Sequence, residues 1–321
     1  MKRFRNHPEG DGPSVDVHQH LWPPSLIDAL RARARPPRLR GWVLELDDEA
    51  PHTVNPEDHD PTVRAAQAVA DELDLVLVSL SAALGIETLP AREARELLDA
   101  YHGGALELPH PFRAWASACL SEVDPPVLAR HLDEGFVGLA LPATTLLDAA
   151  GYERVAPLLE TLEEHDRPLF IHPGPPGPMP PEAPAWWAPI VSYVQQMHAA
   201  WFAFRIHGRP AFRRLRVCFA MLGGLAPLHG ERVLARAGER TAVDAEVFLD
   251  VSSYGTRAID ATVRVLGVDV LVNGSDRPYA GPVEPALGDA VQTALRCSNP
   301  VHLLALREVI DVMDVPAGAR A

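Results

Sequence analysis

Short apolar runs alternate along the chain with longer segments whose apolar positions follow a helical period. The run Leu75 to Leu80 is apolar on both faces of a strand, and Tyr152 to His165 has the spacing of an amphipathic helix. Strands of this kind, separated by helices, are typical of a parallel sheet covered on both sides. The pattern predicts a first strand from Ser14 and seven later ones, at 75–80, 113–118, 136–141, 168–172, 215–220, 247–251 and 268–272.

The intervening helices complete about eight strand–helix units with no break in composition. Eight such units predict an α/β protein, a single-domain closed (β/α)8 TIM barrel. A doubly wound open sheet is the main alternative, but no Gly-x-Gly-x-x-Gly turn follows the first strand. The helices are predicted at 26–35, from Pro61, at 90–102, 125–134 and 152–165, from near Trp186, and at 225–237, 256–265, 284–296 and 299–310.

The barrel is predicted to span 14–310, between an N-terminal extension, 1–13, and a C-terminal tail, 311–321. A small excursion near 36–60 interrupts the first unit. The connection 173–189 is rich in proline, and a stiff loop at the end of a strand suits the wall or lid of a site.

Charge and composition limit what the protein acts on. The formal net charge is −14 and the pI about 5.4, which argues against nucleic acid and anionic membranes as partners. The three cysteines are an odd number in apolar surroundings and are expected to be buried thiols of a reducing compartment. The N-terminus lacks the apolar core of a signal peptide, and no run is long enough to span a bilayer, so a cytoplasmic protein is expected.

Two histidines end the first apolar run. Residues two apart on a strand point to the same side, so His18 and His20 are expected to share one space. Two neutral imidazoles on one face are half of a divalent-metal site. Taken alone, the pair is equally typical of a polar loop, and the interpretation depends on further ligands.

Two other strands also end in ligand-type residues. The fifth ends in His172 and the eighth leads to Asp276. Because a barrel gathers its active site at the C-terminal ends of its strands, the four side chains are expected at one rim. A His₃Asp set suits one divalent ion, Zn²⁺ first and Mn²⁺ or Fe²⁺ as alternatives. Asp276 is also the expected catalytic residue, because it could accept a proton from activated water and pass it on.

Substrate contacts are expected at the same rim. Trp22 follows the histidine pair, Trp186 follows the proline-rich loop, and Tyr254 lies beyond the seventh strand. Such side chains suit a planar or aromatic substrate, although barrel–helix packing is an equally good explanation of each Trp. Arg277 could bind a carboxylate, but a structural ion pair is the more typical role.

Four motifs in order resemble a known family. They lie at 15–23, 170–174, 219–227 and 272–279, and a fifth, less specific one lies at 298–304. Together they resemble the amidohydrolase-related (amidohydrolase 2) family of the TIM-barrel metal-dependent hydrolases, near the branch of aminocarboxymuconate-semialdehyde decarboxylase and the resorcylate decarboxylases. The resemblance implies a barrel with a single divalent metal ion held by His18, His20, His172 and Asp276. The branch contains hydrolases, lactonases, hydratases and non-oxidative decarboxylases, so the resemblance leaves the reaction open.

One position departs from the family pattern. The sixth strand of the family usually ends in His-x-Gly-Gly, and here Met221 stands where the histidine is expected. A thioether cannot transfer protons at neutral pH. Met221 is then either a packing residue, also expected to contact substrate, beside a site that relies on Asp276, or the mark of a barrel that binds ligand with little turnover. His229, eight positions on, is more typical of a surface residue than of a replacement base.

Three functions follow from these observations. The first is a metal-dependent hydrolase that acts on an amide, lactam or lactone bond of a small cyclic or aromatic acid. The second is a non-oxidative decarboxylase of an aromatic or muconate-like acid, and the third is a ligand-binding barrel with weak catalysis. Each implies a small-molecule substrate or ligand. A homodimer is an expectation from the relatives, with the apolar segment 191–204 as the candidate interface.

Overall fold

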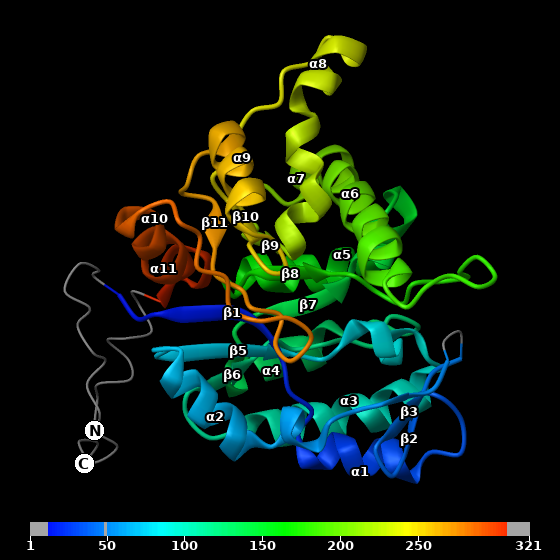
Figure 1. Ribbon diagram of the computed structural model, residues 1–321. Helices are drawn as coiled ribbons and strands as arrows, with labels where there is room; N and C mark the ends of the chain where they lie inside the picture. The colour runs from blue at the N-terminus through cyan, green and yellow to red at the C-terminus, as the bar shows by residue number, and fades with distance from the viewer. Residues whose placement is uncertain (1–11, 48–49, 307–321) are drawn as a thin grey trace, which may run out of the picture.

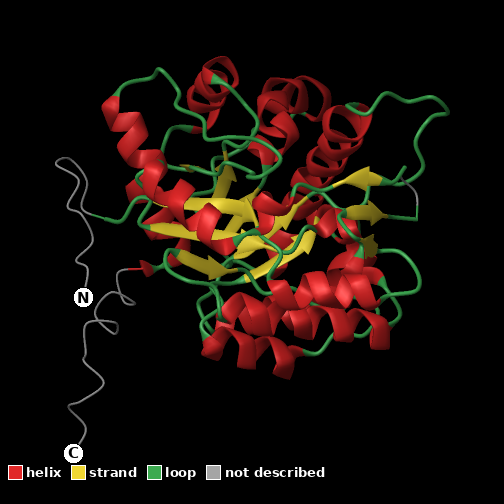
Figure 2. Ribbon diagram, turned by 60° about the horizontal axis from the view of Figure 1, so that its bottom comes forward, coloured by secondary structure: helices red, strands yellow, loops and turns green. Residues whose placement is uncertain are grey.

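The computed structural model describes residues 12–47 and 50–306. In this part of the chain eight strands run parallel, in two sheets of order β1-β5-β6 and β11-β10-β9-β8-β7. Figure 2 shows these strands at the centre of the molecule with the helices around them. The strands are β1 (Val15–His20), β5 (Leu75–Ser79), β6 (Phe112–Ala114), β7 (Leu139–Pro142), β8 (Leu169–His172), β9 (Val217–Phe219), β10 (Val247–Asp250) and β11 (Leu271–Val272).

All eight predicted strands are present, and the α/β class is as predicted. The sheet order, however, is not one continuous eight-stranded ring. One strand at each junction, β6 and β11, is only two or three residues long, and isolated contacts join the two sheets there. Ala116 forms a parallel bridge with Leu139 next to β6, and the amide of Val17 in β1 donates to the carbonyl of Asn273 just after β11, at 2.9 Å.

Helices alternate with the strands along the chain and surround them (Figure 1). The predicted helix 125–134 has the predicted bounds, and most others differ by a few residues. The predicted helix 225–237 begins only at Gly230, because the backbone before it winds left-handed. The helices are α1 (Pro24–Ala32), α2 (Pro61–Ala70), α3 (Ala91–Leu106), α4 (Pro125–Glu134), α5 (Ala149–Glu164), α6 (Tyr193–Ala203), α7 (Arg209–Ala211), α8 (Gly230–Ala237), α9 (Thr256–Leu266), α10 (Asp289–Thr293) and α11 (Asn299–Leu304).

Capping residues explain where several helices begin and end. The Asp60 carboxylate accepts the amides of Thr62 and Val63 at the start of α2, and Pro61 occupies the first turn, where no amide donor is needed. Asp124 caps α4 in the same way, and Gly135 ends that helix in the left-handed conformation that glycine adopts without strain.

The excursion near 36–60 is a small antiparallel sheet formed by β2 (Arg38–Arg40), β3 (Val43–Glu45) and β4 (His52–Thr53). Arg38 pairs with Glu45 across β2 and β3, which fixes the register. Residues 307–310 of the last predicted helix, the tail 311–321 and most of the extension 1–13 lie outside the described residues.

Two further expectations can be compared with the structure. All three cysteines are buried and unpaired, as predicted. In the described part of the chain, no helix has the length and apolar character needed to cross a membrane.

Gly274 lies where the end of β11 approaches β1 and β10. A Cβ atom at this position would lie 2.9 Å from the Cβ of Asp250 and 2.9 Å from the Cβ of His18. Both neighbours are fixed to strands, so neither can withdraw easily. The position therefore requires glycine, and this close approach brings the ends of three strands together.

We expect Gly274→Ala to destabilise the protein by about 1–3 kcal/mol, because the added methyl group overpacks a rigid site. Gly103→Ala is the matched control, since a Cβ at Gly103 in α3 meets nothing within 4 Å. Alanine there should stabilise the helix by up to about 1 kcal/mol. Urea denaturation of both variants measures the difference, and a Gly274→Ala protein as stable as the wild type would contradict the account of this contact.

Candidate metal centre

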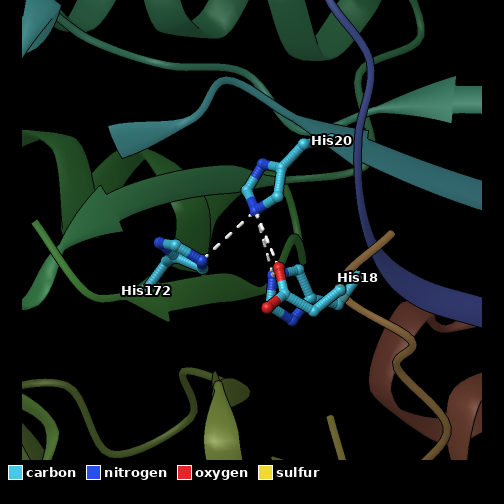
Figure 3. A group of neighbouring side chains, drawn as sticks. His18, His20 and His172 are labelled. Atoms are coloured by element: carbon cyan, nitrogen blue, oxygen red, sulfur yellow. Dashed lines mark hydrogen bonds and ion pairs between the residues drawn. The ribbon is translucent and has the colours of Figure 1, made fainter. Parts of the chain in front are cut away.

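The strand ends bring three imidazoles together. His18 and His20 project to the same side of β1, as the two-residue period of a strand predicts, and His172 is the last residue of β8. The Nε2 atom of His20 lies 3.2 Å from Nε2 of His18 and 3.3 Å from Nε2 of His172 (Figure 3). Residues 152 positions apart in the chain thus meet at one point.

Asp276 approaches the same point from the segment after β11. One carboxylate oxygen lies 3.4 Å from Nε2 of His18 and 3.3 Å from Nε2 of His20. Its amide donates to the carbonyl of His18 at 2.8 Å, and its backbone is left-handed, with φ of 56°. The hydrogen bond holds a conformation that is strained for a residue other than glycine. All four ligand-type atoms lie within 4.8 Å of one another.

Each imidazole has a hydrogen-bond acceptor at its other nitrogen. Nδ1 of His18 lies 2.7 Å from a carboxylate oxygen of Asp250, and Nδ1 of His172 lies 2.8 Å from the carbonyl of Pro173. Nδ1 of His20 lies 3.2 Å from the carbonyl of Ser79. A neutral imidazole has a single N–H, so these acceptors place the hydrogen on Nδ1 and leave a lone pair on Nε2.

This donor set fits a divalent cation. Nε2 atoms only 3.2 to 3.3 Å apart need a proton or a cation between them, because two lone pairs at that distance repel each other. Ligand bonds of about 2.0–2.1 Å in a tetrahedral site place neighbouring ligands about 3.3 Å apart, close to the observed separations. Three imidazoles and a carboxylate suit Zn²⁺, Mn²⁺ or Fe²⁺.

Burial and the neighbouring charges act against each other at this centre. Burial lowers the pKa of His20 and of His172. Burial also opposes the charged form of His18, but the carboxylates of Asp250 and Asp276 outweigh it and raise the pKa of His18 to about 9. For Asp276, burial favours the neutral form, yet His18 and His20 hold its pKa below the ordinary value. Asp276 is therefore an anion at neutral pH, and a cation entering the site would displace a proton from His18.

A cavity of about 640 Å³ opens onto three of the four residues. His20, His172 and Asp276 line its floor, and Met221 and Tyr254 line it as predicted. The rest of the lining is mostly apolar. It comes from the small antiparallel sheet, the segments after β5, β8, β9, β10 and β11, and the start of α6 with the turn before it. Its apolar members are Leu44, Leu46, Ala83, Leu84, Pro173, Pro189, Ile190, Val194 and Leu225, and its polar members include His52, Ser81, Tyr193, Ser253 and Tyr279.

Three residues predicted to contact substrate lie away from the cavity lining. Trp22 is buried, stacks on His59 and donates its indole N–H to the Ser81 hydroxyl. Trp186 is 55% exposed beside Trp187. Arg277 forms an ion pair with Asp71 at 2.8 Å, which is the structural role considered from the sequence.

Sequence reasoning missed several residues around the centre. Asp250 binds His18, and Tyr279 lies over His20 with ring centroids 5.4 Å apart. Asp250 could have been found, because it is an acidic residue at the C-terminal end of a predicted strand, the criterion that identified His172. Tyr279 lies in the motif after Asp276 but has no chemical signal of its own. His229 contacts His198 and is not part of the cavity lining.

Comparisons of the fold find many solved structures, among them several that share less than 20% identity with this chain. The IDCase of Metarhizium anisopliae matches with a TM-score of 0.72 and 18% identity over 92% of this chain and 98% of that chain. The 2,6-dihydroxybenzoate decarboxylase from Rhizobium matches with a TM-score of 0.63 and 17% identity, over 92% and 99%. The 5-carboxyvanillate decarboxylase of Novosphingobium aromaticivorans, complexed with manganese and 4-hydroxy-3-methoxy-5-nitrobenzoic acid, gives 0.66 and 18%, over 95% and 100%.

By sequence alone, neither a protein-family model nor a curated protein matches the chain. A structure described as an amidohydrolase II also shares the fold, with 17% identity and a TM-score of 0.67. The resemblance to the amidohydrolase-related family is therefore confirmed at the level of the fold.

We expect the purified protein to take up about one equivalent of Zn²⁺ or Mn²⁺ and His172→Ala to lose most of it, because one of four ligands is gone. His229→Ala is the control and should retain the metal, since its ring lies outside the cavity. Metal content of chelator-treated and reconstituted protein, by mass spectrometry, gives the answer. Equal metal in both variants would exclude His172 as a ligand.

Proposed function

We propose that the protein is a metal-dependent, non-oxidative decarboxylase of a hydroxylated aromatic acid. The proposal rests on the position of Asp276, which belongs to the four-residue cluster and also lines the floor of the cavity. The solved decarboxylases with this fold support the reaction class, including the one that binds manganese and a nitrobenzoic acid. We also infer that the two sheets and their bridging contacts make the closed (β/α)8 barrel, with domain limits near 14 and 310.

In this proposal His18, His20, His172 and Asp276 hold one divalent cation. The bound cation would supply positive charge that attracts the carboxylate and hydroxyl oxygens of the substrate and stabilises negative charge on them. The apolar walls would then hold the ring of the substrate in a fixed orientation above Asp276. Substrate-binding roles are proposed for Met221, Tyr254 and Tyr279 on the basis of their place in the lining.

Asp276 would move the one proton that the reaction needs. As an anion it can accept the proton of the substrate hydroxyl and then deliver it to the ring carbon that bears the carboxylate. A C–H bond forms there, the C–C bond to the carboxylate breaks, and its electron pair restores the ring as CO₂ leaves. The product is the corresponding phenolate, which regains a proton on release, and no water is consumed.

The hydrolase hypothesis relies on the same carboxylate. Hydrolysis needs a base to activate water and an acid to protonate the leaving group. Met221 stands where the family provides an imidazole, so Asp276 would have to serve both steps. In decarboxylation Asp276 would also accept one proton and deliver it, so the solved decarboxylases with this fold are what favours decarboxylation. The ligand-binding hypothesis would be excluded by turnover of the wild-type protein.

The lining of the cavity also suggests the charge of the substrate. The centre attracts one carboxylate of the substrate, because that is where the positive charge of the bound cation would lie. A second carboxylate would lie against leucine, isoleucine and valine side chains. Removing an ion from water to an apolar wall without a partner costs several kcal/mol. We infer that the substrate is a monocarboxylic acid.

We expect the metal-loaded protein to release CO₂ from one or more hydroxybenzoic acids and, in D₂O, to place deuterium at the carbon that lost the carboxylate. Asp276→Asn should lower the turnover number at least a hundredfold, because an amide cannot deliver the proton. Mass spectrometry of the product and a CO₂ assay measure both. Metal content of Asp276→Asn must be measured alongside, since loss of the ion would lower turnover for a different reason.

Hydrolysis predicts other products. Incorporation of ¹⁸O from labelled water into a lactone or amide substrate, with no CO₂ from any aromatic acid, would overturn the proposed reaction. His229→Ala should show wild-type turnover, and a large loss in that variant would point to a base outside the cavity.

A second prediction concerns selectivity. Ile190 lines the cavity mouth and is 62% exposed, so it can be replaced by a charged residue without burying the charge. Ile190→Arg should bind benzene-1,3-dicarboxylate about two- to fivefold more tightly than Ile190→Gln, the matched neutral control. Benzoate should bind the two variants equally. Titration calorimetry on zinc-loaded protein measures all four affinities, and wild-type protein that already prefers the diacid would refute the monocarboxylate inference.

A further inference from the structure

Asp250 is a buried carboxylate at the end of β10 with no part in the proton transfer proposed above. Its side chain is fully buried, and both of its oxygens have partners. One oxygen, Oδ2, faces Nδ1 of His18 at 2.7 Å. The other, Oδ1, faces Met221 and Ser252.

The Oδ1 atom accepts three hydrogen bonds. The amides of Met221 and Ser252 donate at 3.0 and 2.9 Å, and the Ser252 hydroxyl donates at 2.5 Å. The two amides can only donate, so Oδ1 must remain an acceptor. The carboxylate is therefore fixed in rotation, with Oδ2 directed at His18.

The Met221 amide belongs to a strained segment. Residues 221 to 225 all have φ between 49° and 61°, a left-handed turn that includes Met221, Leu222 and Leu225 as well as two glycines. Left-handed backbone costs about 1–2 kcal/mol at each residue other than glycine. The hydrogen bond to Asp250 ties the start of this turn to β10, and through Oδ2 to β1.

We propose that Asp250 is a positioning residue that fixes the tautomer of His18. By accepting the Nδ1 hydrogen, it leaves Nε2 of His18 free to bind a cation at the four-residue centre. The inference rests on the proposed function only for the presence of that metal site, and it is independent of the reaction. Asp250 also links the turn after β9 to the metal centre, so the placement of Met221 and of His18 depends on one carboxylate.

Asparagine at this position provides a sharp test, because it has nearly the same shape. The three donors at Oδ1 require the amide oxygen there, so the amide NH₂ must occupy the place of Oδ2. Its hydrogen would point at Nδ1 of His18 and force that nitrogen to accept. The proton of His18 would then move to Nε2, where it blocks the metal.

We expect Asp250→Asn to bind zinc about 10- to 100-fold more weakly than the wild type, the usual effect of losing a partner of a metal-binding histidine. The thermal midpoint of the metal-free protein should change by only a few degrees. Ser252→Ala is the matched control, since it removes one donor from Oδ1 and leaves Oδ2 in place, and its zinc affinity should stay within a few-fold. Chelator competition measures the affinities.

Histidine ¹⁵N NMR of the zinc-loaded proteins separates positioning from a purely structural role. The wild type should show three imidazoles bound through Nε2, and Asp250→Asn at saturating zinc should show two, with the third ring protonated at Nε2. Equal affinity and three bound rings in the variant would overturn the inference, as would wild-type His18 bound through Nδ1, a result that needs no folded variant. Wild-type protein that binds no zinc would instead count against the proposed function.

Discussion

The structure depends on the orientation of three imidazole rings that share one buried point. An imidazole can bind a cation through Nε2 only if its hydrogen sits on Nδ1, and each ring here has an acceptor at that atom. Two acceptors are backbone carbonyls, of Ser79 in β5 and of Pro173 just after β8, and a side-chain substitution does not remove them. The third is Asp250, the one acceptor that a side-chain substitution can remove. The orientation of two rings therefore depends on the backbone and that of the third on a single carboxylate.

Strained backbone and close packing lie around the same centre. Asp276 and the turn at 221 to 225 adopt left-handed backbone next to the centre, and Gly274 permits the ends of β1, β10 and β11 to meet. Arg64 is buried behind β1, where its guanidinium donates to the carbonyl of His20 and to the side chain of Gln19. Strain of this kind persists only where the surroundings determine the conformation, and the hydrogen bonds of Asp250 and Asp276 provide that determination.

The sequence was sufficient for the parts of the fold that depend on local pattern. Every predicted strand exists because strands that are apolar on both faces leave a strong signal, and His18, His20, His172 and Asp276 meet because parallel strands end at one edge. The residues that the structure places elsewhere than expected are held by partners that are distant in the chain. Nothing near Arg277 in sequence reveals Asp71 as its partner, and the indole of Trp22 turns to Ser81 instead of the cavity. The late start of α8 follows from a left-handed turn that contains Met and Leu as well as glycine, which no propensity rule predicts.

The apolar cavity favours decarboxylation over hydrolysis on electrostatic grounds as well. Decarboxylation turns a carboxylate, which is strongly hydrated in water, into neutral CO₂, which is not. Side chains such as Leu225 and Val194 offer the carboxylate no hydrogen bonds, so its charge must be compensated at the floor of the cavity, and the CO₂ that leaves, being neutral, is no longer held there. Hydrolysis instead produces a new carboxylate and a polar leaving group, both of which would have to form against the same walls. Under the proposed function, a wall that disfavours charge would lower the barrier of decarboxylation and oppose the release of charge in hydrolysis, and Met221 would contribute as part of that wall although its thioether cannot move a proton.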